Sequence, residues 1–239
     1  VMEVTARRYA ESIDDVPIAV TALSETRLKD AGAQTLIDIE RYVPNLTVSA
    51  ARATNTTLTA YIRGVGQNDP LWGFEPGVGL YVDDVYLARP QDGVLDLLDI
   101  ERVEVLRGPQ GTLYGKNTLG GAIKYITREL PDVTSGHVEA VVGSFNQRDL
   151  KAGFSTPLIE DELFVGISAA KLGREGYGEV VAPSPQAGED VSDKDLLAWR
   201  LNLTWKPSDE FTLKFVADDL DDDSNIRGGH RLNASAATG

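Results

Sequence analysis

The stretch Ile100-Glu-Arg-Val-Glu-Val-Leu-Arg-Gly-Pro-Gln-Gly-Thr-Leu-Tyr-Gly115 decides the fold of the first half of the chain. It joins a β-type run at residues 102–106 to a glycine-rich segment that extends from Gly108 to Gly121. β-branched residues favour strands, whereas glycine permits positive φ angles and a close approach of one backbone to another. We therefore expect a strand that leads into a closely packed turn.

Helix and strand signals are mixed around this stretch, from Val16 to Ile126. Ser24 is an N-cap candidate for a short helix at 25–31, which Gly32 would end. Apolar residues at near-helical spacing predict a second helix over 36–43, which Pro44 stops. Further β-type runs are separated by glycine-rich turns and lie at 46–49, 58–62, 79–82 and 122–127. This half is predicted to be a small α+β domain.

Beyond Pro131 the hydrophobic period becomes two residues, which is the period of a β-strand. In the segment 196–206, polar or small residues alternate with an apolar row formed by Leu197, Trp199, Leu201, Leu203 and Trp205. Strands are also expected at 138–145, 149–155, 163–172 and 211–217. The second half is therefore predicted to contain five consecutive strands.

The connections between these strands separate two interpretations, because a soluble β-sandwich also shows alternation. Every second connection is a tight turn, and the tryptophans Trp199 and Trp205 lie near the two ends of the apolar row. Transmembrane barrels combine short turns at one end, strands near ten residues and aromatic residues at the membrane interfaces. The pattern favours barrel strands with a lipid-facing row, and the sandwich remains the alternative.

Composition excludes several classes of function. The chain has 23 Lys and Arg against 37 Asp and Glu, a net charge of −14, which argues against a nucleic-acid partner. Without cysteine, neither a disulfide framework nor a thiolate metal site can form. His137 and His230 are too few to suggest a metal pair, and the aspartates of 218–223 indicate a solvated loop or a contact with divalent ions on surface lipids.

No motif brings together a nucleophile, a base and a group that orients the base, so we expect no enzyme activity and no cofactor. The segment 111–117 departs from a phosphate loop at two positions, because its first glycine is displaced and Asn117 replaces the required Ser or Thr. The longest charge-free stretches have ten residues, too few for a membrane-spanning helix.

Several ordered segments resemble the plug of the TonB-dependent outer-membrane receptors. They are Glu3-Val-Thr-Ala-Arg-Arg8, Asp15-Val-Pro-Ile-Ala-Val-Thr-Ala-Leu-Ser24, Tyr42-Val-Pro-Asn-Leu-Thr47, Ile62-Arg-Gly64, Val78-Gly-Leu-Tyr-Val-Asp-Asp-Val-Tyr86, the 100–115 block and Gly120-Gly-Ala-Ile123. The resemblance implies an α+β plug domain at 1–131, followed at 132–239 by the N-terminal antiparallel strands of a transmembrane β-barrel that is incomplete in this chain.

The resemblance also implies a function, which is active uptake of a scarce nutrient through the outer membrane of a Gram-negative bacterium. The expected partners are TonB, which pulls on the N-terminal segment of the plug, outer-membrane lipid and a nutrient ligand. An iron chelate such as a ferric siderophore is the expected ligand, with cobalamin or an oligosaccharide as alternatives. A soluble plug-like binding or signalling module is the competing hypothesis.

The resemblance assigns roles within the plug to two groups of residues. Arg63 and Arg107 end β-type runs, and the family pairs plug arginines with carboxylates of the barrel wall. Those carboxylates lie in later strands that the chain lacks, so both arginines are expected to be incompletely paired, and exposed charges or local salt bridges are the alternative. The glycine-rich plug motif comprises Gly64, Gly108, Pro109, Gly111, Tyr114, Gly115, Gly120 and Gly121.

Two further groups receive roles in coupling and in ligand binding. Residues 1–8 resemble the end of a TonB-binding segment, which adds a strand to its partner, and a disordered tail is the alternative. Its coupling residues would be Glu3, Val4, Thr5 and Ala6. The loops at 64–77 and 89–93 are expected at the plug apex, where Asn68, Asp69, Trp72, Phe74, Arg89 and Gln91 would contact substrate. The alternative is that the two aromatic rings only pin the loop to the domain.

Overall fold

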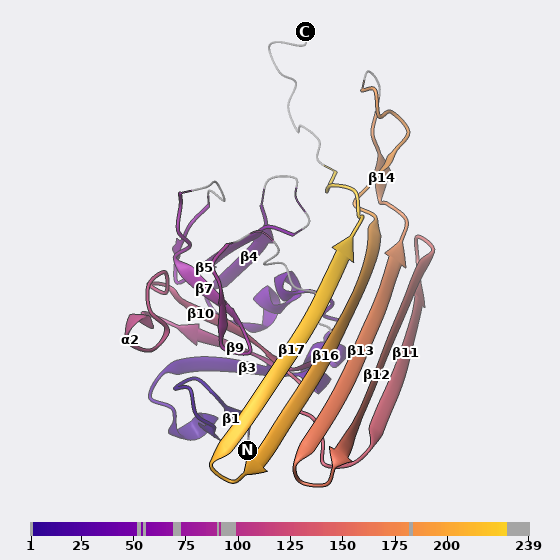
Figure 1. Ribbon diagram of the computed structural model, residues 1–239. Helices are drawn as coiled ribbons and strands as arrows, with labels where there is room; N and C mark the ends of the chain where they lie inside the picture. The colour runs from indigo at the N-terminus through magenta and orange to yellow at the C-terminus, as the bar shows by residue number, and fades with distance from the viewer. Residues whose placement is uncertain are drawn as a thin grey trace. The chain divides into compact units, whose positions relative to one another are not determined.

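A computed structural model describes residues 2–51, 54, 56–68, 73–89, 91, 99–181 and 184–228. The chain folds as two compact units, Val1–Glu129 and Leu130–Gly239 (Figure 1). The first unit mixes helices and strands, and the second is built from strands. No helix within the described residues is long and apolar enough to cross a membrane.

The first unit is built around a five-stranded sheet in the order β3-β9-β10-β7-β8. Its central strand β10 runs antiparallel to β9 and parallel to β7, so that Ile123 lies opposite both Val105 and Leu80. β9 and β10 are buried on both faces, so that the charged side chains of Glu104 and Lys124 are buried together with the apolar ones. The strands are β3 Ala19–Ser24, β7 Val78–Val82, β8 Val85–Leu87, β9 Ile100–Arg107 and β10 Gly121–Thr127.

Each face of this sheet has its own hydrophobic core, because successive side chains of a strand point to opposite faces. On one face, Val103, Val105 and Ile123 pack with residues of the helical segments and of a second small sheet. On the other face, Leu106 and Ala122 belong to a smaller cluster that also contains Val4, Ala6, Tyr81 and Tyr114. The N-terminal segment therefore covers part of the central sheet.

Of the two helices predicted for this unit, the first is present as an α-helix and the second is a 3₁₀-helix. α1 Glu25–Asp30 begins at Ser24, whose hydroxyl accepts a hydrogen bond from the Arg27 N–H at 3.3 Å, and it is followed by Gly32 at φ +64°. The second helix is the 3₁₀-helix η2 Leu36–Tyr42, which the Asp38 carboxylate caps at the Thr35 N–H. It ends because Val43, preceding proline, is extended.

The remaining elements of the first unit are short. A three-stranded sheet contains β4 Leu46–Ala50, β5 Leu58–Ile62 and β6 Val65–Gly66, and α2 Gly111–Tyr114 follows β9. At the N-terminus, β1 Glu3–Val4 pairs with β2 Glu11–Ser12, and the 3₁₀-helix η1 Ile13–Asp15 follows. The strands expected at 46–49, 58–62, 79–82, 102–106 and 122–127 are all present, whereas β3 was not expected.

The second unit is an antiparallel sheet in chain order, β11-β12-β13-β16-β17. Its strands are β11 Ser135–Gly143, β12 Gln147–Ile159, β13 Leu163–Arg174, β16 Lys194–Ser208 and β17 Phe211–Asp222. Between β13 and β16 the long connection carries a small hairpin, β14 Gly178–Glu179 with β15 Asp190–Val191. The five predicted strands are confirmed, and because they form one continuous sheet, the two-sheet sandwich is wrong.

One face of this sheet presents apolar side chains outward. Leu197 and Trp199 are exposed, with Trp199 at 42%. Across the strands, Ile167 lies opposite Leu201, and Leu203 lies opposite Phe215, so the row continues from strand to strand. Trp205 packs edge-on against Phe211, with ring centroids 6.4 Å apart. The exposed apolar row predicted from the sequence is therefore present.

The aspartates after residue 217 were expected in a solvated loop, and this expectation is wrong. Asp218 to Asp222 belong to β17 rather than to a loop, and Asp218 pairs with Arg200 at 3.4 Å. Alternation along the strand sends neighbouring carboxylates to opposite faces, which prevents them from converging on one cation. Accordingly, the described residues contain no group of three His, Asp or Glu side chains that could hold a metal ion.

Candidate functional site

The N-terminal segment is folded onto the first unit. Its strand β1 places Glu3 opposite Ser12 and Val4 opposite Glu11. The side chains of Val4 and Ala6 are completely buried. The disordered-tail alternative is therefore wrong, because residues 3–6 are held both by strand pairing and by burial of apolar surface.

A network of buried charges surrounds Thr5. Glu104 Oε1 accepts hydrogen bonds from the Thr5 N–H at 2.8 Å and from Arg102 Nε at 2.8 Å. Lys124 Nζ donates to the Thr5 carbonyl and to the Thr5 hydroxyl, both at 2.8 Å. Glu104 and Lys124 are 0% and 1% exposed and lie opposite each other on β9 and β10.

Tyr114, from the glycine-rich motif, completes this network. Its hydroxyl donates to the Ala6 carbonyl at 2.8 Å, and its backbone carbonyl accepts from the Tyr81 hydroxyl at 2.7 Å. Burial, together with the nearby carboxylates of Asp84 and Glu104, raises the pKa of the Tyr114 hydroxyl. Tyr114 therefore remains a neutral hydrogen-bond donor throughout the physiological pH range.

Sequence reasoning missed Arg102, Glu104 and Lys124 as functional candidates. A local signal was present, because Glu104 interrupts the run Val103 to Leu106 and Lys124 interrupts the run Ala122 to Ile126. A charge that lies between buried apolar residues of a strand requires a buried partner. That signal identifies the presence of a network but not the segment to which it binds.

The glycine-rich motif forms a turn that is closed by backbone hydrogen bonds. Gly108 N–H donates to the Gly120 carbonyl at 2.9 Å, and Gly120 N–H donates to the Gly77 carbonyl at 2.8 Å. At Gly121, φ is +145° and a Cβ atom would lie 2.1 Å from the Leu106 carbonyl oxygen. The other motif positions are Gly64 in the β5–β6 turn, the exposed Pro109, Gly111 at the start of α2 and Gly115 directly after α2.

The two predicted plug arginines lie next to each other in the fold. Arg107 is the last residue of β9, and Arg63 occupies the turn after β5. Arg63 Nη1 is 3.4 Å from the position of a Cβ atom on Gly108, the residue that follows Arg107. Arg107 Nε is buried and has no hydrogen-bond partner within the described part of the chain.

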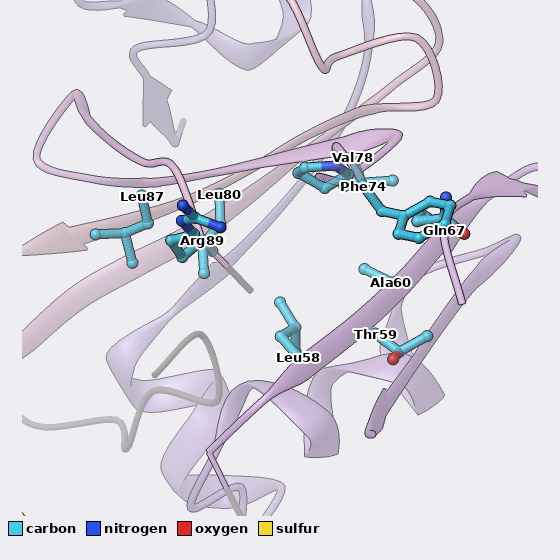
Figure 2. A pocket seen from close by; sticks show the side chains of 10 residues that line it. Leu58, Thr59, Ala60, Gln67, Phe74, Val78, Leu80, Leu87 and Arg89 are labelled. Carbon is cyan, nitrogen blue, oxygen red and sulfur yellow. The ribbon is translucent and has the colours of Figure 1, made fainter. Parts of the chain in front are cut away.

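A small cavity brings together residues of the two predicted apex loops. Phe74 and Arg89 both line it, and Gln67 lies beside Phe74 (Figure 2). Its volume is about 30 Å³. The remaining lining residues come mainly from β5, β7 and β8, and they are Leu58, Thr59, Ala60, Pro76, Val78, Leu80 and Leu87.

The other apex candidates are less informative. Asn68 is exposed and Gln91 is partly buried, and neither lines this cavity. Asp69 and Trp72 lie outside the described residues. The loop that carries Phe74 is tied to the glycine-rich turn by an ion pair between Glu75 and Lys116.

Residues 12–122 match the family model described as TonB-dependent Receptor Plug Domain. This match covers the strands β3, β7, β8 and β9 of the central sheet, the glycine-rich turn and the residues that line the cavity. The chain belongs to the TonB-dependent receptors, and its first unit contains their plug domain.

Similar proteins agree with this assignment. The pesticin receptor of Yersinia enterocolitica is 30% identical over 213 residues, which are 87% of this chain and 30% of that protein. The vitamin B12 transporter BtuB of Vibrio vulnificus is 30% identical over 157 residues, 64% of this chain and 24% of that protein. The solved structure of the ferric yersiniabactin uptake receptor FyuA from Yersinia pestis aligns with a TM-score of 0.75 at 26% identity, covering 85% of this chain and 31% of that one.

The chain therefore spans about a third or less of the length of these relatives. The five-stranded sheet of its second unit resembles strands of TonB-dependent barrel structures. Membership of this family confirms the predicted location in the outer membrane of a Gram-negative bacterium. The relatives named above are described as receptors or as a transporter.

Proposed function

We propose that this chain is the plug and the first barrel strands of a receptor that takes up a negatively charged iron chelate, such as a ferric siderophore, with energy supplied through TonB. The observation that carries the proposal is the cavity shared by Phe74 and Arg89. It joins the two loops that were expected to contact substrate. The ferric yersiniabactin uptake receptor, a structural relative, supports an iron chelate, and the vitamin B12 transporter BtuB keeps cobalamin as the alternative.

The chemistry of the cavity suits part of an anionic chelate. Arg89 supplies a permanent positive charge with a planar set of donors, Phe74 supplies an aromatic face, and Leu80 and Leu87 supply an apolar base. A volume of about 30 Å³ has room for roughly two water molecules. The cavity would therefore accept only a small substituent of the ligand, while the rest is bound elsewhere in the receptor.

Arg89→Gln in the full-length receptor should weaken binding of a negatively charged ferric tris-catecholate by about tenfold, because a charge-assisted hydrogen bond is lost. Binding of an uncharged ferric tris-hydroxamate should change little. Phe74→Ala should weaken both chelates, and Val85→Ala, at an exposed plug position outside the cavity, should weaken neither. Fluorescence titration of each chelate measures these affinities. Tight binding of cyanocobalamin with no binding of either chelate would contradict the proposal.

The plug arginines fit a role in anchoring. Arg107 Nε is a buried donor that lacks a partner among the described residues, and Arg63 lies beside it. A buried donor of this kind gains from a carboxylate supplied by another part of the receptor. We therefore propose that Arg63 and Arg107 pair with carboxylates of the barrel wall.

The apolar row of the second unit fits contact with outer-membrane lipid and argues against the soluble plug-like module. Leu201→Arg should reduce the free energy of folding into lipid by about 2–4 kcal/mol, since it would place a charge on the lipid-facing side of the strand. Asn202→Arg is the matched control, because its side chain points to the opposite face. The folded fraction in lipid vesicles, seen as the heat-modifiable band on gels, reports the difference. Equal losses in both variants would exclude a lipid-facing row.

A further inference from the structure

Three side chains from distant parts of the sequence hold the backbone at Thr5 and Ala6. Glu104 of β9 accepts from the Thr5 N–H, Lys124 of β10 donates to the Thr5 carbonyl, and Tyr114 of α2 donates to the Ala6 carbonyl. Each of these hydrogen bonds is 2.8 Å long. These three contacts are to main-chain atoms and fix the path of the segment, and Lys124 also donates to the Thr5 hydroxyl.

The two charged residues bind the segment more closely than they bind each other. Glu104 Oε2 and Lys124 Nζ are 4.0 Å apart, and Glu104 Oε2 has no hydrogen-bond partner among the described residues. A direct, saturated ion pair would be the expected arrangement for a purely structural pair in a dry core. Here Thr5 lies between the two charges and supplies a donor to one and an acceptor to the other.

If residues 4–6 detached, neither Glu104 nor Lys124 would be left without an oppositely charged partner. Glu104 would keep Arg102, whose Nε donates to it at 2.8 Å, and Lys124 would keep Asp84 at 3.1 Å. Isolated buried charges are strongly unfavourable, and this arrangement avoids them in both the docked and the released state. The network is therefore suited to reversible binding of residues 4–6.

We infer that Glu104, Lys124 and Tyr114 form a clasp that holds residues 4–6 on the plug sheet and sets how often this segment detaches. They are positioning residues, because they act on the availability of the N-terminal segment and not on the ligand. Their importance for transport rests on the proposed coupling of this segment to TonB, which needs an extended and accessible strand.

Thiol labelling at position 4 tests the clasp in the full-length receptor without TonB. The 239 residues contain no cysteine, so Val4→Cys places a buried reporter in the held segment. Val48→Cys places an equally buried reporter in the other hydrophobic core. The labelling rate at each reporter is read by mass spectrometry of the modified peptide.

Tyr114→Phe removes only the hydroxyl that bonds the Ala6 carbonyl, and it should accelerate labelling at position 4 about fivefold, the factor expected for one hydrogen bond. Lys124→Met should accelerate it more, by about tenfold or above. Tyr86→Phe is the matched control, because it removes a neighbouring hydroxyl that bonds Asn117 instead. Labelling at position 48 should not change in Tyr114→Phe.

The clasp is refuted if Tyr114→Phe and Tyr86→Phe label at equal rates at position 4. It is also refuted if positions 4 and 48 accelerate together in Tyr114→Phe, because the whole plug would then have loosened. Tyr114→Phe keeps the test decisive if Lys124→Met fails to fold. If Tyr114→Phe accelerates labelling at position 4, the clasp is supported. If the same receptor also takes up its ligand without TonB, the proposed coupling to TonB is overturned while the clasp stands.

Discussion

Replacing Glu104 by alanine should destabilise the plug by about 3–5 kcal/mol, the range measured when one partner of a buried ion pair is removed. The substitution leaves the buried cations Arg102 and Lys124 beside each other, with only the partly exposed carboxylates Glu101 and Asp84 as partners. It also removes the acceptor of the Thr5 N–H. Hydrogen exchange at the Val105 and Ile123 amides, at the centre of β9 and β10, measures the loss.

Glu101→Ala is the matched control for this prediction. Glu101 also pairs with Arg102, but its side chain is 40% exposed, so its removal should cost about 1 kcal/mol or less. Equal effects of Glu104→Ala and Glu101→Ala on amide exchange would show that the network stabilises the plug no more than a surface ion pair does.

Gly121→Ala should be the most damaging substitution within the glycine-rich motif, with a cost of about 3 kcal/mol or more. Its Cβ atom would lie 2.1 Å from the Leu106 carbonyl oxygen, and its φ of +145° is unfavourable for an L-residue. The obstructing atom belongs to the backbone of the paired strand β9, so relief requires the central sheet to separate. The urea concentration at which the plug becomes sensitive to protease reports this loss.

Gly111→Ala is the control from the same motif. A Cβ atom there meets no heavy atom within 4 Å among the described residues, and the position opens the short helix α2. Alanine should therefore be neutral or slightly stabilising. If Gly111→Ala and Gly121→Ala destabilise equally, the motif requires glycine for a reason other than the close approach of β10 to β9.

Strands with a local pattern could be predicted from the sequence. The alternation of Leu197, Trp199 and Leu201 is complete within one strand, and it identifies β16 without knowledge of any partner. The same applies to the N-cap at Ser24 and the glycine at position 32, which define α1 through contacts inside one turn. These features depend on neighbours in the sequence, so a single sequence contains them.

β3 could not be predicted in this way. Ala19–Ser24 lacks the alternation of a half-buried strand, and it becomes a strand because Val20 pairs with Leu106 at the edge of the central sheet. η2 was expected to be an ordinary helix and is a 3₁₀-helix, although its start and its end near Pro44 agree with the sequence. Tertiary pairing decides the first case, and we have no physical account of the second.

The α+β plug, the five following strands, the glycine-rich turn and the family could all be predicted from the amino-acid sequence. The meeting of Glu104, Tyr114 and Lys124 at Thr5 and Ala6 became visible only in the folded chain. Glu104 and Lys124 are separated from Thr5 by 99 and 119 positions, and no periodicity extends over such intervals. Burying a charge is unfavourable until the folded chain supplies its partner, so Glu104 and Lys124, which are far apart from Thr5 in the sequence, form one binding site with it only when the sheet is assembled.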